Sequence, residues 1–160
     1  METMTSQNML PLLKTHFGFG SFLPNQEQII NSVLSGNDTI TIMPTGGGKS
    51  LCFQLPALAM EGTAIVVSPL IALMKDQVDA LQTNGIAARF FNSSQPYEEQ
   101  QQVLKDLQNG KLKLLYVAPE SLPQLHFILK SIPVGLFAID EAHCSSSWGH
   151  DFRPAYIQLK

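Results

Sequence analysis

The stretch from Asp38 to Ser50 reads DTITIMPTGGGKS, and it decides the expected fold. It begins with a run rich in β-branched residues, which is typical of a short strand. Three glycines, Lys49 and Ser50 follow, and a helical pattern begins at Leu51. Glycines let backbone N–H groups converge on phosphate oxygens, and the start of a helix adds a partial positive charge. The stretch therefore predicts a phosphate-binding loop between a strand and a helix.

The residues of this loop have separate expected tasks. Thr45, Gly46, Gly47 and Gly48 would cradle the phosphates, Lys49 would reach the β- and γ-phosphates, and the Ser50 hydroxyl would bind Mg²⁺. Met43 stands where the strict form of the pattern has its first glycine, which indicates a helicase-type loop and not that of a kinase or GTPase. The alternative is a glycine-rich hairpin that happens to carry Lys-Ser, and the flanking strand and helix disfavour it.

Further along the chain, apolar runs alternate with segments of helical period. This alternation predicts an α/β fold, a parallel sheet with helices on both faces. The expected strands are 38–43, 63–68, 86–92, 112–117 and 134–139. One helix is expected over 25–34, and others begin near Pro69, Pro96 and Pro119. Asn84-Gly85 and Asn109-Gly110 are expected to end two of them. The apolar stripe of the helix after Pro69 comprises Leu70, Leu73, Met74, Gln77, Val78 and Leu81.

Two acidic residues follow the last expected strand. Asp140 lies where a strand of a parallel sheet ends, and a carboxylate there can hold Mg²⁺ beside a phosphate loop. Glu141 can orient and deprotonate an attacking water. The alternative is that both acids only stabilise the start of a helix. The upstream Lys49-Ser50 pair favours the catalytic interpretation.

Composition limits the other possibilities. The chain has 160 residues and a mass of 17.6 kDa, which suits one domain. Charged residues are 14%, too few for a disordered tail, which suggests strands buried on both faces or a surface that meets another part. The net charge of −3 argues against nucleic-acid binding through bulk charge alone.

Cys52 and Cys144 have no CxxC partner, so both are expected to be small packed side chains. No apolar run is long enough to cross a membrane, and we expect an intracellular protein of the cytoplasm, nucleoid or nucleus.

Together, MPTGGGKS (43–50) and DEAH (140–143) resemble the first RecA-like motor domain of superfamily 2 helicases. Four other stretches are similar to motifs of the RecQ family of DNA helicases. They are FGFGSFLPNQ (17–26), VSPLIALMKDQ (67–77), YVAPE (116–120) and the aromatic-rich AHCSSSWGHDFRPAY (142–156). The resemblance extends from Leu12 to Lys160.

The resemblance implies ATP and Mg²⁺ as cofactors and DNA as partner. Phe19 would stack on adenine and Gln26 would read its edge, although Leu23 replaces an arginine usual in the family. Contacts to single-stranded DNA, or their coupling to ATP hydrolysis, would involve Ser68, Pro69, Lys75, Pro119, Glu120, His143, Trp148, Phe152 and Arg153. Aromatic faces can stack on bases. Trp148 and Phe152 could instead be core residues, but their loop is rich in Ser, Gly, His and Asp, which favours a ligand-facing role.

On this resemblance, residues 1–160 are expected to be the ATP-binding lobe of a 3′-to-5′ DNA helicase, truncated after the aromatic-rich loop. Such enzymes close a second RecA-like lobe over the nucleotide. We therefore expect this piece alone to bind nucleotide weakly, to hydrolyse it slowly, not to unwind duplexes, and to be poorly soluble. Two alternatives stay open. One is an RNA helicase or remodelling ATPase of the same superfamily, and the other is a truncated, non-catalytic binding protein.

Overall fold

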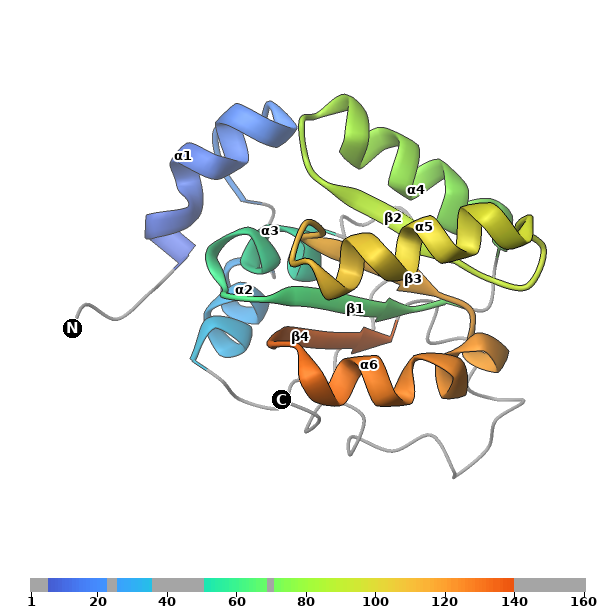
Figure 1. Cartoon of the computed structure of the whole chain (residues 1–160). Coiled ribbons are helices and arrows are strands. Elements are labelled where there is room, and N and C mark those ends of the chain that lie inside the picture. Colours follow the sequence, from blue (N-terminus) through green and yellow to red (C-terminus); the bar gives the residue numbers. More distant parts are fainter. Residues whose placement is uncertain (1–5, 23–25, 36–50, 69–70, 140–160) are drawn as a thin grey trace, which may run out of the picture. The chain divides into compact units, whose positions relative to one another are not determined.

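Four apolar runs of the sequence form one sheet of parallel strands (Figure 1). The strands are β1 (Thr63–Val67), β2 (Ala88–Phe91), β3 (Leu114–Val117) and β4 (Val134–Ile139), and their order in the sheet is β2-β3-β1-β4. The structure, a computed structural model, describes residues 6–22, 26–35, 51–68 and 71–139. The chain divides into two compact units, residues 1–60 and 61–160, and each is described by itself.

In the second unit, the register of the strands assigns their side chains to two faces. Ile65 lies beside Leu115 on one side and Phe137 on the other, and all three belong to one buried cluster. Ala64 and Leu114 alternate with them and therefore point to the opposite face, where both are also buried. Every residue of β1 and β3 is buried, as expected for central strands of a parallel sheet.

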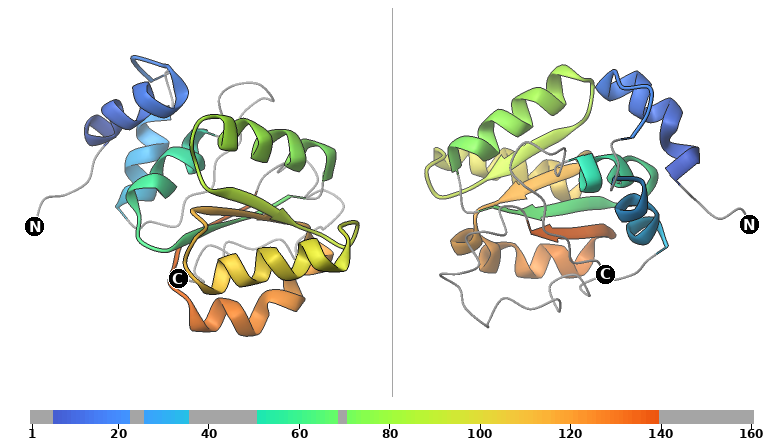
Figure 2. Two further views of the ribbon diagram at one scale, coloured as in Figure 1. Left: turned by 45° about the horizontal axis from the view of Figure 1, so that its top comes forward. Right: turned by 180° about the vertical axis from the view of Figure 1, so that it is seen from behind.

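Helices cover both faces of this sheet. On the face of Ile65 lie α5 (Tyr97–Gln108), the 3₁₀ helix η3 (Pro119–Leu125) and α6 (His126–Ser131). The first two contribute the buried Val103, Leu107 and Leu125 to the core, and α6 packs the half-buried Ile128 and Leu129 against it. On the opposite side lies α4 (Ile71–Thr83), which buries Met74, Val78 and Leu81 (Figure 2). The predicted α/β class, with a parallel sheet between two helical layers, is confirmed.

The predicted helix ends are confirmed where glycine follows the helix. Gly85 after α4 and Gly110 after α5 have φ of 81° and 71°, values that glycine adopts without strain. Pro96 precedes the first residue of α5, as predicted. The helix opened by Pro119 begins as a 3₁₀ helix instead of an α-helix. Pro123 lies inside it and lacks the N–H that an α-helical turn needs.

The described part of the first unit is a small group of helices. It comprises η1 (Ser6–Met9), α1 (Leu10–Leu12), the π-helical turn η2 (Leu13–Phe17), α2 (Gln26–Leu34) and α3 (Leu51–Ala59). Their core contains Met9, Leu13, Ile30, Leu51 and Leu55. The helix predicted over 25–34 is confirmed from Gln26 onward. The strand predicted over 38–43 lies outside the described residues, and the single domain over 1–160 stays a prediction.

The amino-terminal end of the sheet is closed by main-chain contacts. Thr63 N–H donates to the Pro133 carbonyl at 3.1 Å, and the Thr63 hydroxyl donates to the Leu112 carbonyl at 2.7 Å. Gly62 has φ of 85°, and a Cβ on it would lie 2.3 Å from the Pro133 carbonyl oxygen. This approach of two backbones therefore requires glycine.

The outer edge of β2 is covered by side-chain amides. The main-chain carbonyls of Ala88 and Phe90, on either side of Arg89, point away from β3. They alternate along the strand with the carbonyls of Ala87 and Phe91, which accept hydrogen bonds from the β3 side. Gln82 Nε2 donates to the Ala88 carbonyl at 2.8 Å, and Gln95 Nε2 donates to the Phe90 carbonyl at 2.9 Å. Both outward carbonyls of this short strand are therefore satisfied.

Candidate functional site

The carboxyl-terminal end of the sheet is where the candidate site residues of the second unit gather. Because the strands are parallel, the residues that follow them meet at one edge, which is the usual ligand edge of such sheets. Ser68 follows β1, Asn92 follows β2, and Ala118 follows β3. Ser68 N–H donates to the Val117 carbonyl at 3.0 Å, and Ala118 N–H donates to the Phe91 carbonyl at 3.4 Å. These bonds join the three strand ends.

Ser68 and Lys75 occupy different environments at this edge. Ser68 is buried, with 1% of its surface exposed, whereas Lys75 on α4 is exposed. Their predicted role as contacts to nucleic acid is untested and stays a prediction. Pro69, which the same prediction includes, lies outside the described residues.

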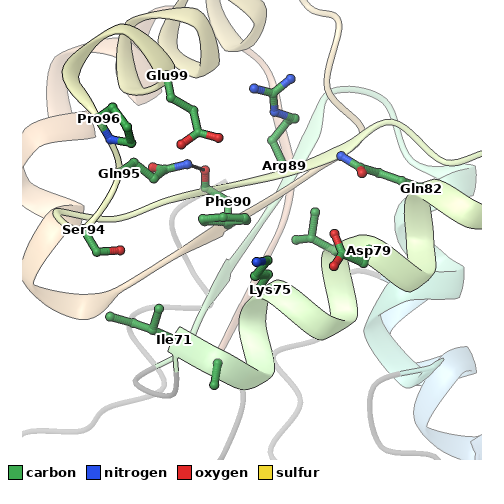
Figure 3. Close-up of a pocket in the computed structure, with 12 residues that line it drawn as sticks. Ile71, Lys75, Asp79, Gln82, Arg89, Phe90, Ser94, Gln95, Pro96 and Glu99 are labelled. Atoms are coloured by element: carbon green, nitrogen blue, oxygen red, sulfur yellow. Dashed lines mark hydrogen bonds between the residues drawn. The ribbon is translucent and has the colours of Figure 1, made fainter.

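A groove of about 480 Å³ runs between α4 and the segment that follows β2 (Figure 3). Lys75 and Asp79 of α4 line one side, and Ser94 and Glu99 line the other. Arg89 also lines the groove, and its guanidinium lies 3.9 Å from the carboxylate of Asp106. The groove thus contains both signs of charge and is not a basic channel.

The segment after β3 holds the residues of the YVAPE motif. Glu120 is exposed at the start of η3, and Pro119 is half-buried. Ser121 N–H donates to the Ala118 carbonyl at 2.9 Å. The Ser121 hydroxyl is buried, and it has no hydrogen-bond partner within the described part of the chain.

In the first unit, the two predicted adenine contacts differ in exposure. Phe19 is 56% exposed and follows Gly18, whose φ of 78° turns the chain at the end of η2. Gln26 begins α2 and is only 3% exposed. An exposed aromatic face is available for stacking on a base, and both roles stay predictions. Leu23 lies outside the described residues.

The phosphate loop and the acidic motif also lie outside the described residues. This applies to Thr45, Gly46, Gly47, Gly48, Lys49, Ser50, Asp140, Glu141, His143, Trp148, Phe152 and Arg153. The helix predicted after the loop is confirmed as α3, which begins at Leu51. Within the described ranges, no cluster of three His, Cys, Asp or Glu side chains could hold a metal ion. The Mg²⁺ ligands proposed from the sequence, Ser50 and Asp140, supply the hard oxygen donors that Mg²⁺ prefers.

Cys52 on α3 is buried, as predicted for a small packed side chain. Burial raises the pKa of the Cys52 thiol to about 11, so it stays protonated at neutral pH. Cys144 lies outside the described residues. None of the helices described is long and apolar enough to span a membrane.

One polar cluster at the ligand edge is not indicated by the sequence motifs. Asn92 is the last residue of the predicted strand 86–92, and Gln95 and Gln100 belong to no motif. In the structure, the Asn92 main chain bonds to both of these side chains. The available signal was the run Asn-Ser-Ser-Gln immediately after an apolar strand, because Asn and Ser side chains commonly bond to nearby main chain.

Comparisons with known proteins agree with this architecture. The profile described as DEAD/DEAH box helicase matches residues 23–160. The chain is 56% identical over 152 residues to the ATP-dependent DNA helicase RecQ of Haemophilus influenzae, covering 94% of this chain and 25% of that protein. It is 53% identical over 160 residues to the protein of the same name from Pasteurella multocida, covering 99% of this chain and 25% of that protein.

A third relative has a similar identity. The RecQ helicase of Bacillus subtilis is 53% identical over 152 residues, covering 93% of this chain and 26% of that protein. The chain thus spans about a quarter of the length of the curated relatives it matches. The resemblance to RecQ helicases predicted from the motifs is confirmed. The chain belongs to the DEAD/DEAH box helicase family.

Proposed function

We propose that the full-length protein is an ATP-dependent 3′-to-5′ DNA helicase of RecQ type, and that this chain is its ATP-binding motor lobe. The observation that carries the proposal is the identity of 53–56% to RecQ helicases over nearly all of this chain. Single-stranded DNA and duplex junctions are the proposed substrates. A second RecA-like lobe is the proposed partner of the nucleotide site.

The proposed chemistry is phosphoryl transfer to water. Lys49 binds the β- and γ-phosphates, the main chain of Thr45–Gly48 donates hydrogen bonds to them, and Glu141 takes a proton from the attacking water. Ser50 and Asp140 would hold Mg²⁺, which would neutralise charge on the phosphates. Phe19 and Gln26 bind the adenine.

The proposed coupling to DNA uses the other edge residues and the loop after the acidic motif. Ser68, Pro69, Lys75, Pro119 and Glu120 position the DNA backbone, partly through main-chain N–H groups at helix starts. His143, Trp148, Phe152 and Arg153 respond to bound single-stranded DNA. The preference for DNA over RNA is supported by the names of the relatives, each of which is called a DNA helicase.

The test compares the full-length wild-type protein with Lys49→Ala and Trp148→Ala. Lys49→Ala should lower DNA-stimulated ATP hydrolysis by about 10³-fold or more, because an essential phosphate contact is lost. Trp148→Ala should keep DNA-independent hydrolysis and lose most of the stimulation. Duplex unwinding by Lys49→Ala at the wild-type rate would overturn the proposal. Stronger stimulation by single-stranded RNA than by DNA would favour the RNA helicase alternative instead.

A further inference from the structure

Asn92, directly after β2, is the centre of a buried polar network. The residue is fully buried. Its side-chain Oδ1 accepts a bond from Ser94 N–H at 2.9 Å and another from the Ser94 hydroxyl. Its main-chain carbonyl accepts from Gln100 Nε2 at 2.7 Å. The network therefore joins the end of β2 to the first turn of α5.

Gln95 completes the network from the edge of the sheet. Its Oε1 accepts from Asn92 N–H at 2.9 Å, and its Nε2 donates to the Phe90 carbonyl at 2.9 Å. A neighbouring parallel strand would bond to β2 at the same two positions with its own N–H and C=O. The Gln95 amide thus takes the place of a strand and fixes the direction in which the chain leaves β2.

The network also reaches α4. Asn92 Nδ2 lies 3.9 Å from Met74 Sδ, and Met74 is fully buried next to the exposed Lys75. Sulfur is a weak acceptor, so this hydrogen bond adds little energy, and α4 and the segment after β2 are joined here by the packing of two buried side chains. Ser94 and Lys75 line the two walls of one groove (Figure 3), and Asn92 bonds to Ser94 and contacts Met74, the neighbour of Lys75.

The chemistry of this cluster favours a positioning role. An apolar side chain could fill the space under α4 without the cost of burying an amide. A fully bonded polar network instead fixes one geometry, because each lost bond leaves a buried polar atom unsatisfied. The geometry fixed here is that of α4 and the 92–96 segment at the ligand edge of the sheet.

We propose that Asn92 is a positioning residue for nucleic-acid binding. It holds α4 and the segment after β2 so that Lys75 and Ser94 face the same stretch of single-stranded DNA backbone. This inference rests on the proposed function, since it needs a DNA strand at this edge.

The experiment measures DNA-stimulated ATP hydrolysis by the full-length protein against the concentration of oligo(dT). Asn92→Ala should raise the half-saturating oligo(dT) concentration by about tenfold, equivalent to about 1.4 kcal/mol of binding free energy. The KM for ATP at saturating oligo(dT) should change less than twofold. Circular dichroism and the melting temperature report whether the variant is folded.

A second variant covers the case in which Asn92→Ala does not fold. Gln100→Met keeps the length and helix propensity of the side chain and removes the bond to the Asn92 carbonyl. Gln100→Met should raise the half-saturating oligo(dT) concentration by about threefold, with an unchanged KM for ATP. The matched control is Gln102→Met, the same change on the same helix at an exposed residue whose amide bonds to Asp106, and it should behave as the wild type.

The outcomes separate this inference from the proposed function. Wild-type hydrolysis without any stimulation by oligo(dT) would overturn both. Stimulation of the wild type, with half-saturation unchanged in folded Asn92→Ala or in Gln100→Met, would overturn only the positioning role. An equal rise in the KM for ATP and in half-saturation would also overturn it, because that result indicates general loss of structure.

Discussion

The two ends of the parallel sheet share main-chain bonds between strands but differ in the side chains that supplement them. At the amino-terminal end, main-chain groups bond to one another, as in the bonds from Ala64 N–H to the Lys113 carbonyl and from Lys113 N–H to the Ala87 carbonyl, both 2.8 Å. At the carboxyl-terminal end, the side-chain amides of Gln95 and Gln100 complete the bonding around Asn92. Main-chain bonds also join the strands at the carboxyl-terminal end, as from Ser68 N–H to the Val117 carbonyl, so the amide cluster around Asn92 is what distinguishes this end.

This difference separates stability from binding. Main-chain bonds survive most substitutions, so the amino-terminal end can hold the strands in register whatever side chains are present. The carboxyl-terminal end exposes Lys75 and buries a Ser121 hydroxyl that lacks a partner within the described residues. Substitutions that disturb the close backbone approach or the buried Thr63 hydroxyl at the first end should therefore lower stability, whereas removal of the Ser121 hydroxyl at the second should leave stability nearly intact.

The largest effect is expected for Gly62→Ala at the amino-terminal end. The new Cβ would overlap the Pro133 carbonyl oxygen, and φ of 85° is strained for alanine. The free energy of unfolding should fall by about 3 kcal/mol or more, as measured by denaturant titration. The control is Gly110→Ala, where φ is also positive but nothing lies within 4 Å of the new atom. It should cost only about 1 to 2 kcal/mol. Equal costs would show that the approach to Pro133 is not rigid.

A medium effect is expected for Thr63→Val, which removes the buried hydroxyl at the same end. Valine keeps the shape and leaves the Leu112 carbonyl without the bond that it accepts at 2.7 Å. The free energy of unfolding should fall by about 1 to 2 kcal/mol. Half-saturation by oligo(dT) should match the wild type. A change in the half-saturating oligo(dT) concentration without any loss of stability would contradict the view that the amino-terminal end affects stability and not binding.

The smallest effect is expected for Ser121→Ala, the matching removal of a buried hydroxyl at the carboxyl-terminal end. Because that hydroxyl has no partner among the described residues, its loss should not destabilise the fold. The melting temperature should stay the same or rise, with a gain of at most about 1 kcal/mol. A loss as large as that of Thr63→Val would instead indicate a partner for Ser121 in the remaining part of the chain.

The sequence was sufficient to predict the sheet and most helix ends. The runs at 63–68, 112–117 and 134–139 are too apolar to be surface loops. The glycines after α4 and α5 indicate where those helices end. Strand β4 matches its predicted range, whereas β1, β3 and β2 are shorter than predicted by one, two and three residues. The 3₁₀ start at Pro119 depends on Pro123, whose missing N–H has only a local effect on hydrogen bonding and leaves no periodic signal in the sequence.

The candidate site could be predicted only where its residues belong to a recognisable sequence motif. The loop ending in Lys49-Ser50 and the pair Asp140-Glu141 carry their chemistry in sequence order. The Asn92 network does not, because its contacts reach Met74 on another helix and depend on the sheet register. Side-chain amides that replace main-chain partners have no fixed spacing, so they become visible only in three dimensions.

The amide cover on β2 has a consequence for how copies of this protein meet one another. A bare edge strand invites a second chain to add a strand, which leads to domain swapping or fibrils. With Gln82 and Gln95 bound to the outward carbonyls of Ala88 and Phe90, an incoming strand must first displace two internal hydrogen bonds. The charge of Arg89 at the middle of the strand adds a further obstacle to close stacking. The covered edge of β2 thus opposes the joining of sheets between neighbouring copies of the protein.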